Sequence, residues 1–430
     1  MQDLKRKIGV LGLSANIINT IVGAGIFALP ALVASTLGSA SVLAYLFCGI
    51  LVILVMLCFA EVGSKITGSG GVYSYLNTSF GPYFGFITAI LFVLSTISAD
   101  AAVANAVADV FSSIFPVFKN KIPRIIFFAF VFGGLGYINI IGIKEGMKLV
   151  KLITITKLIP LLLLVIFSFG EITFSNLSIH SFPEISQIGK TSLLLFFAFQ
   201  GAESGLSISG EVINPKKNIP KAIFISITGV LILYILIQTI SQGILGDSLP
   251  NYSNNPLSQV ANSVFGPVGF SILTIGAGVS MFGYLSSEVL GIPRVLYGAA
   301  KDKVLPISWL AKVHPKFATP YTAILIYIIL AFAFATFGGF EQLAILSSAT
   351  ILLVYLGVSL SVIKLRKKTK TDNSNFKLPG GFTIPILSSI VILAFLINLS
   401  LVEVLSITGV ILLLSLLYLL KKKKHDDISL

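Results

Sequence analysis

Four ionisable side chains lie inside long apolar stretches of the sequence, where charge is rare: Asp100, Lys157, Glu203 and Glu288. A charged residue at the centre of a lipid bilayer costs about 2.5 to 3.5 kcal/mol on insertion scales. Such residues are therefore retained where they hold an ion or a charged small molecule, or carry a proton, inside a membrane. Each of the four is a candidate functional residue on this ground.

Two of the apolar stretches also contain glycine clusters, Gly23-Ala24-Gly25 and Gly201-Ala202-Glu203-Ser204-Gly205. Glycine alone indicates little, because small residues also serve close packing between membrane helices. Here polar residues stand beside each cluster, and at that depth such groups normally line a cavity or a buried site. Interruptions of this kind, five spans apart, are typical of carriers built from two inverted repeats around a site at half depth. The polar neighbours are Asn16, Asn19, Thr20, Gln200, Glu203 and Ser204.

The elements that must position these residues are expected to be transmembrane helices. The chain has 430 residues, of which 55% are hydrophobic and 11% are charged, and its mean hydropathy is +0.97. Soluble proteins contain about 25% charged residues. A helix of about 20 apolar residues crosses the hydrocarbon layer, and twelve such stretches are present. They cover residues 8–34, 40–62, 84–115, 123–143, 148–169, 191–212, 221–245, 266–298, 318–338, 341–363, 381–400 and 403–420.

The net charge of +13 follows from membrane topology and does not require a nucleic-acid partner. If both termini are cytoplasmic, most of the 30 Lys and Arg residues, including residues 5–7, fall in or beside cytoplasmic segments. This is the positive-inside pattern of a multi-pass protein of the cell membrane, to which the loop at residues 119–124 is the clear exception. A module of interleaved basic and aromatic residues that would bind nucleic acid does not occur.

Enzyme chemistry finds little support in the sequence. The histidines, His180, His314 and His425, all lie in expected loops or in the tail, and neither a metal-binding spacing nor a nucleophile elbow occurs. Cys48 and Cys58 fall inside one apolar stretch, where we expect them to pack as small hydrophobes. We therefore expect a transporter that needs no cofactor and no metal ion.

Four motifs, in this order and spacing, carry a resemblance to a known family. Over nearly its whole length the sequence resembles the amino acid-polyamine-organocation permeases. Within that family it looks most like the bacterial basic amino acid and polyamine antiporters, which include arginine/agmatine exchangers. The motifs are Gly23–Phe27; Ala60-Glu61 through Gly70–Tyr75 to Gly81-Pro82; Phe199–Glu203 through Gly210–Ile223; and Arg294–Pro306.

The resemblance implies an all-α integral membrane protein of twelve transmembrane helices in a LeuT-like arrangement. Two inverted repeats of five helices, residues 1–169 and 170–365, would each begin with a discontinuous helix. Residues 366–430 would form two accessory helices and a cytoplasmic tail. The discontinuous helices agree with the glycine clusters found independently above. An amino acid or amine would bind between them and cross by alternating access, in an oligomeric state that the sequence leaves open.

The resemblance also implies a substrate site made largely of main-chain groups. Free N–H groups at residues 23–25 would face a substrate carboxylate, since a helix N-terminus favours anions. Open carbonyls at residue 21 and around residues 197–200 would accept from the substrate ammonium. Phe197 takes the position of the family's aromatic gate, although it could equally be one of 33 phenylalanines packing in the core or against lipid. The implied residues are Ile21, Gly23, Ala24, Gly25, Phe197, Ala198 and Gln200.

Lys157 matches the lysine of proton-coupled or sodium-independent relatives, whose ammonium takes the place of sodium in sodium-coupled carriers. Gain and loss of its proton would bias inward-open against outward-open states, or its permanent charge would tether neighbouring helices. Both interpretations predict transport without sodium.

Glu203 matches the family's glutamate beside the unwound segment, where it would bridge helices, carry a proton or form a structural hydrogen bond.

Asp100 and Glu288 bear on the choice of substrate. By position, Asp100 falls where relatives that carry basic substrates place a polar residue against the distal end of the substrate. Glu288 falls near an aromatic residue of the same pocket, which departs from the arginine/agmatine pattern. Opposite charges within about 4 to 6 Å stabilise each other, so two carboxylates around one cavity favour a substrate with a distal cation.

Arginine, lysine, ornithine and polyamines are substrates of that kind, and proton-coupled symport or exchange would move them. If either carboxylate instead pairs with Lys157 or is protonated, the substrate is a neutral amino acid. A sensor that binds amino acids without net transport is the alternative from another functional class.

Overall fold

Long apolar stretches in hydrocarbon leave the main chain few ways to satisfy its hydrogen bonds, and the α-helix is the one open to a single segment. The computed structural model describes residues 8–66, 71–142, 146–179, 181–205, 212–305, 307–368, 376–378 and 380–426. The basic residues 5–7 and parts of the last three motifs lie outside these ranges. Within them the regular structure is helical, apart from an isolated parallel bridge between Ile8 and Val212.

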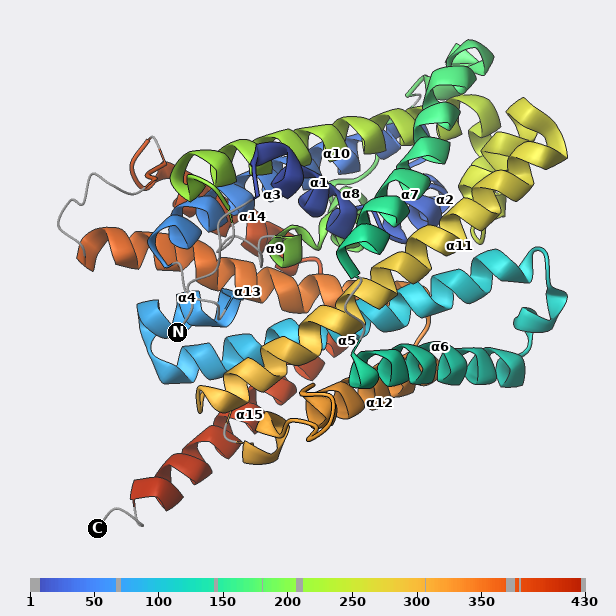
Figure 1. The fold of residues 1–430 in the computed structure, drawn as a ribbon. Helices are drawn as coiled ribbons and strands as arrows, with labels where there is room; N and C mark the ends of the chain where they lie inside the picture. The colour runs from blue at the N-terminus through green and yellow to red at the C-terminus, as the bar shows by residue number, and fades with distance from the viewer. Residues whose placement is uncertain are drawn as a thin grey trace.

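Most of the long helices run along one common direction, as Figure 1 shows. Each apolar stretch that we expected to be a span overlaps one helix or a broken pair. The helices are α1 (Val10–Ile21), α2 (Gly25–Leu37), α3 (Ser41–Lys65), α4 (Gly71–Phe80), α5 (Pro82–Ser112), α6 (Lys121–Ile141), α7 (Gly146–Ser168), α8 (Ile185–Leu195), α9 (Ala202–Gly205), α10 (Pro215–Leu245), α11 (Pro256–Lys301), α12 (Tyr321–Phe337), α13 (Phe340–Lys368), α14 (Thr383–Leu396) and α15 (Leu401–Asp426).

Seven helical segments of the described chain are long and apolar enough to cross a membrane. The helices α1, α12 and α14 are also apolar but shorter. These lengths and compositions are those of a multi-pass membrane protein. The seven segments are Gly25–Lys65, Pro82–Ser112, Lys121–Ile141, Lys217–Tyr252, Pro256–Lys301, Phe340–Lys367 and Leu401–Leu420.

Helix α5 lies in the middle of the bundle, with α13 and α11 packed against it (Figure 1). The side chains of residues 97–108 on α5 are buried, and many of them are alanine. Small side chains let neighbouring helix backbones approach closely where lipid offers no hydrophobic driving force. In contrast, α15 touches the rest of the chain at few points, and large apolar side chains such as Leu412 and Leu416 are exposed along it.

The chain leaves helical geometry at both glycine clusters. α1 ends at Ile21 and α2 begins at Gly25, so residues 22–24 form a break. After α8, a 3₁₀ turn at Phe196–Phe199 leads through Gly201 into α9. Gly201 has a φ of +104°, a conformation that glycine adopts without steric cost. A β-carbon there would collide with the carbonyl oxygen of Thr20, so the second break lies directly against the last turn of α1.

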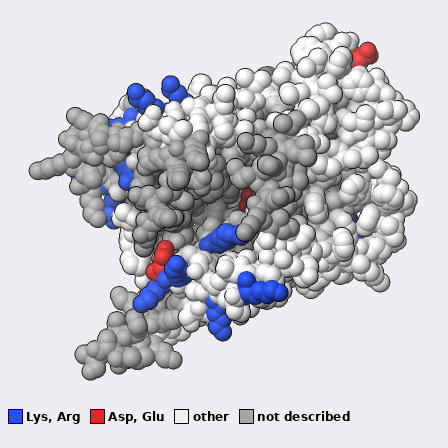
Figure 2. Space-filling model, viewed as in Figure 1, with Lys and Arg blue, Asp and Glu red and all other residues white. Residues whose placement is uncertain are grey.

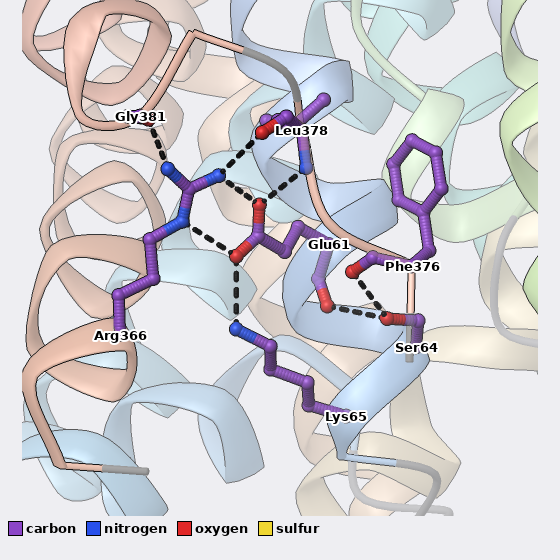
Figure 3. A network of polar contacts seen from close by, with 7 residues as sticks. All are labelled: Glu61, Ser64, Lys65, Arg366, Phe376, Leu378 and Gly381. Atoms are coloured by element: carbon purple, nitrogen blue, oxygen red, sulfur yellow. Dashed lines mark hydrogen bonds and ion pairs between the residues drawn. The ribbon is translucent and has the colours of Figure 1, made fainter. Parts of the chain in front are cut away.

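A charged network closes the end of the bundle at which α3 and α13 finish (Figure 3). Glu61 of α3 is fully buried, and Arg366 of α13 donates to both of its carboxylate oxygens, with 2.8 Å between Nε and Oε1. Lys65 Nζ donates to Oε1 at 2.8 Å, and the N–H of Leu378 donates to Oε2 at 2.9 Å. Arg366 also donates to the carbonyls of Leu378 and Gly381. The network therefore joins α3, α13 and the segment before α14.

Charge is distributed unevenly over the surface. On the face drawn in Figure 2, Lys and Arg side chains gather over the half of the molecule that holds the N-terminus. The opposite half of that face is largely uncharged. Basic residues at one end of a helix bundle are the pattern that the positive-inside rule describes for cytoplasmic ends.

Candidate functional site

A small internal cavity lies where the two helix breaks meet. Its volume is about 10 Å³, room for about one water molecule, so an amino acid does not fit in this conformation. The α1–α2 break, α5, the turn before α9 and α11 supply its walls. The resemblance implied seven residues whose main chain or ring would bind substrate, and all of them except Ala198 line the cavity. The lining residues are Ile21, Gly23, Ala24, Gly25, Ala99, Val103, Phe197, Gln200 and Tyr284.

Ala198 lies directly behind Gly25. A β-carbon built on Gly25 would stand 2.5 Å from both the Cα and the Cβ of Ala198. Separations below 3.0 Å essentially never occur for real Cβ atoms, and here the neighbour includes main chain that cannot rotate away. Glycine at position 25 is therefore what lets the two breaks touch and share one cavity.

We expect Gly25→Ala to lower the melting temperature of the purified protein, since overpacking a close contact costs about 1 to 3 kcal/mol. Gly229→Ala is a suitable control, because a β-carbon at Gly229 on α10 would meet no atom within 4 Å. Thermal melting in detergent measures both variants. Equal melting temperatures for the two variants would contradict a forced contact between Gly25 and Ala198.

Main-chain donors at the cavity are open. Among the described residues, none accepts a hydrogen bond from the N–H groups of Gly23, Ala24 or Gly25, which precede or begin α2. The start of a helix presents such N–H groups together with the positive end of the helix dipole. This end of α2 therefore has the chemistry to hold a carboxylate.

The carbonyls at the end of α1 already have donors. Lys157 of α7 is 1% exposed, and its Nζ donates to the carbonyl oxygens of Asn19 at 2.5 Å and Val22 at 2.7 Å. The Tyr234 hydroxyl donates to the carbonyl of Ile21 at 3.3 Å. Carbonyls at a helix C-terminus carry the negative end of the helix dipole and favour a cation. The ammonium of Lys157 thus fills a cation position that the α1 break creates.

Glu203 connects the turn before α9 to α13. Its Oε2 accepts from the N–H of Gly201 at 3.2 Å and from the hydroxyl of Tyr355. Tyr355 is 1% exposed on α13, so this carboxylate lies behind the cavity wall rather than in it. These hydrogen bonds connect the segment around α9 to α13.

Gln200 lines the cavity and links it to two scaffold helices. Its amide donates to Ser348 Oγ at 2.9 Å and accepts from Ser347 Oγ at 2.7 Å, both on α13. Ser95 of α5 in turn donates to the Ser347 carbonyl at 2.9 Å. The side-chain nitrogen and oxygen of Gln200 are therefore both bonded to serine hydroxyls of α13. The substrate acceptor that the resemblance implies at this residue is its main-chain carbonyl.

Asp100 and Glu288 form a second layer behind the cavity. Asp100 is 0% exposed and its Oδ2 accepts from the Tyr327 hydroxyl at 2.8 Å. Its Oδ1 and the Oε2 of the buried Glu288 have no hydrogen-bond partner within the described residues. The two carboxylates lie within electrostatic range of each other and of Tyr284, whose ring lines the cavity. Lys157 donates to main-chain carbonyls, and within the described residues it forms no ion pair with either carboxylate.

Several residues that shape this region carry no signal in the sequence. Tyr234, Tyr327 and Tyr355 each donate a hydroxyl to a group that the sequence did mark: Ile21, Asp100 and Glu203. A tyrosine in an apolar stretch is ordinary, because its ring is apolar and its hydroxyl needs a single partner. Their roles become visible once the helices are placed beside one another.

Comparisons with known proteins show the family to which this chain belongs. A family model described as amino acid permease matches residues 8–420. The serine/threonine exchanger SteT of Bacillus subtilis is 31% identical over 400 residues, which span 90% of this chain and 89% of that protein. The branched-chain amino acid permease BcaP of the same organism is 27% identical, over 100% of this chain and 95% of the relative. The methylthioribose transporter of Bacillus subtilis is 28% identical, over 99% of this chain and 95% of that protein. This chain belongs to the amino acid permease family, and is a multi-pass membrane transporter rather than an enzyme.

Proposed function

We propose that this permease carries cationic amino acids or polyamines across the cell membrane by alternating access, without sodium, by proton-coupled symport or exchange. In this it would work like the basic amino acid and polyamine antiporters. The observation that carries the proposal is the pair of buried carboxylates, Asp100 and Glu288, each with an oxygen that has no partner in the described chain. Buried charge is stable where it is paired, and a cationic substrate would supply the missing partner.

The proposed architecture has twelve spans, with two inverted LeuT-like repeats at residues 1–169 and 170–365 and with α14 and α15 as accessory helices. The support is that the breaks after α1 and before α9 begin the two halves and share one cavity. Both termini would be cytoplasmic. The concentration of basic side chains at one end of the molecule supports this orientation (Figure 2).

In the proposed site, the N–H groups of residues 23–25 bind the substrate carboxylate. The carbonyls of Ile21 and residues 197–200 receive the α-ammonium, and Phe197 covers the substrate. Asp100 and Glu288 then attract the distal cation once Tyr284 moves aside. Lys157 and Glu203 would couple a proton to the cycle or tether the helices around the breaks.

A neutral substrate is the second candidate, and the names of the relatives favour it. Two of them are described as carriers of serine and threonine or of branched-chain amino acids. In that case Asp100 and Glu288 would remain protonated, because two unpaired carboxylates close together in a buried site disfavour each other's charge.

A thermal-shift screen of the purified protein separates these candidates. We expect lysine, arginine, ornithine or a polyamine to raise the melting temperature more than serine, leucine or alanine does. Asp100→Asn should weaken binding of the stabilising cation by at least about tenfold, which corresponds to about 1.4 kcal/mol. Asp109→Asn on the same helix is the matched control, because Asp109 pairs with Arg124 at 2.6 Å, away from the cavity lining.

Stabilisation by small neutral amino acids alone would replace the cationic assignment with the neutral one. Radiolabel counterflow in proteoliposomes tests transport itself. A ligand that binds with no counterflow at all would identify a sensor instead of a carrier.

A further inference from the structure

A second hollow lies well away from the substrate cavity, at the end of the bundle where α13 finishes. It is a groove of about 510 Å³ between the last residue of α4 and the final turns of α13. Ligand pockets in proteins commonly measure about 300 to 1,000 Å³, so this groove is large enough for a small molecule. Its lining residues are Phe80, Leu360, Ile363, Lys364 and Lys367.

The groove has two chemically different parts. Phe80, Leu360 and Ile363 form an apolar floor, and Leu360 is 41% exposed on the outside of the bundle. Lys364 and Lys367 follow within one helical turn, toward the helix end, and both side chains are exposed. The Lys364 ammonium lies 4.6 Å from the centre of the Phe80 ring, a cation–π contact that holds it at the edge of the apolar floor.

The cations on this last turn of α13 have different partners. Arg366 points inward, where Glu61 neutralises it (Figure 3). Lys364 and Lys367 line the groove instead, and neither pairs with a carboxylate in the part of the chain that the structure describes. Within the described residues, the groove therefore presents two positive charges without an acidic partner above an apolar surface, at the end of a membrane-spanning helix.

We propose that this groove binds one anionic phospholipid, whose phosphate lies between Lys364 and Lys367 and whose acyl chain covers Leu360, Ile363 and Phe80. A lipid matches the site because it joins a negative headgroup to an apolar chain in the same order as the lysines and the floor. Basic pockets at the cytoplasmic ends of transmembrane helices attract anionic headgroups, and lysine stems lie along apolar surface while the ammonium reaches the interface.

Occupancy would connect the lipid to the transport cycle. α4 and α13 are in contact along the groove, and α13 also carries Ser347, Ser348 and Tyr355, which bond to Gln200 and Glu203. A lipid bound to both α4 and α13 would stabilise the position of α13, the helix that bonds to Gln200 in the cavity wall and to Glu203 behind it. The proposal does not depend on whether the substrate is cationic or neutral.

Native mass spectrometry of the full chain tests the site directly. The probe is phosphatidylglycerol added to delipidated protein, with phosphatidylcholine as the neutral comparison. We expect Lys364→Gln with Lys367→Gln to weaken phosphatidylglycerol binding by about tenfold or more, as the loss of two interfacial lysines predicts. Lys312→Gln with Lys316→Gln removes the same charge from exposed lysines outside the groove and should leave binding unchanged.

A third variant, Leu360→Asn, tests the acyl chain, because it alters the floor and keeps both lysines. It should also weaken binding of the lipid, while glycerol phosphate without acyl chains should bind none of the proteins measurably. Equal lipid binding by the two lysine variants would overturn the proposal. Binding of glycerol phosphate as tight as that of the lipid would overturn it too, and would identify an anion site. Melting temperatures of all variants show that each one is folded.

Discussion

Lys157→Met should reduce transport by at least about 100-fold, or about 2.8 kcal/mol. The variant removes two charge-assisted hydrogen bonds, each worth about 1.5 to 3 kcal/mol, and leaves the buried carbonyls of Asn19 and Val22 without a donor. Counterflow of labelled substrate in proteoliposomes measures the loss. We also expect a lower melting temperature, because the same contacts hold the end of α1 in place.

Three comparisons test the role proposed for Lys157. Lys190→Met on α8 removes an exposed lysine and should leave transport unchanged. Lys157→Arg keeps a permanent charge, so retained exchange would favour the tether and lost exchange would favour proton gain and loss. Replacing sodium with choline should not change the flux of the natural chain. A strong sodium requirement, or full activity of Lys157→Met, would refute the role proposed for this ammonium.

Glu61→Gln should destabilise the protein by about 3 to 5 kcal/mol, the usual cost of removing one partner from a buried ion pair. The side chain of Glu61 is 0% exposed and that of Arg366 is 5% exposed, so water cannot replace the lost partner. An amide lacks the charge and can accept through one oxygen, whereas the carboxylate receives Arg366, Lys65 and Leu378 together. Thermal melting of the purified variant measures the effect.

Lys65→Gln is the matched control for Glu61→Gln. Lys65 donates to the same carboxylate, but its side chain is 17% exposed and Glu61 keeps both Arg366 and Leu378 after the change. A pair of this kind contributes about 1 kcal/mol or less. If Glu61→Gln melted at the temperature of Lys65→Gln, the network in Figure 3 would not hold the ends of α3 and α13 together.

Much of the helical framework could be predicted from the sequence, because long apolar stretches in hydrocarbon have few alternatives to the helix. The breaks were also predictable, since glycine clusters beside polar residues mark them. The position of Lys157 followed from the resemblance, and the structure brings its ammonium to the end of α1.

Other features depend on contacts between distant segments and left no local signal. From the sequence, Arg366 is expected to be one of several cations in a basic loop. In the structure its guanidinium is buried against Glu61, which lies 305 positions away. Helix α4 is a short mixture of polar and apolar residues between two spans, and nothing in its composition shows that it packs on α13. The second-layer position of Asp100 and Glu288 was also unpredictable, because it depends on which face of α5 and α11 turns toward the cavity.

The seam between Gly25 and Ala198 has a consequence for affinity. A void that admits a single water cannot admit an amino acid, so the loaded and unloaded proteins must differ in shape. The apparent affinity for substrate is then the intrinsic affinity multiplied by the fraction of molecules in the open, binding-competent conformation. A variant in which this contact is separated, but the cavity is not filled, would therefore bind substrate more tightly. The same variant would return more slowly to the closed conformation, which the transport cycle also requires.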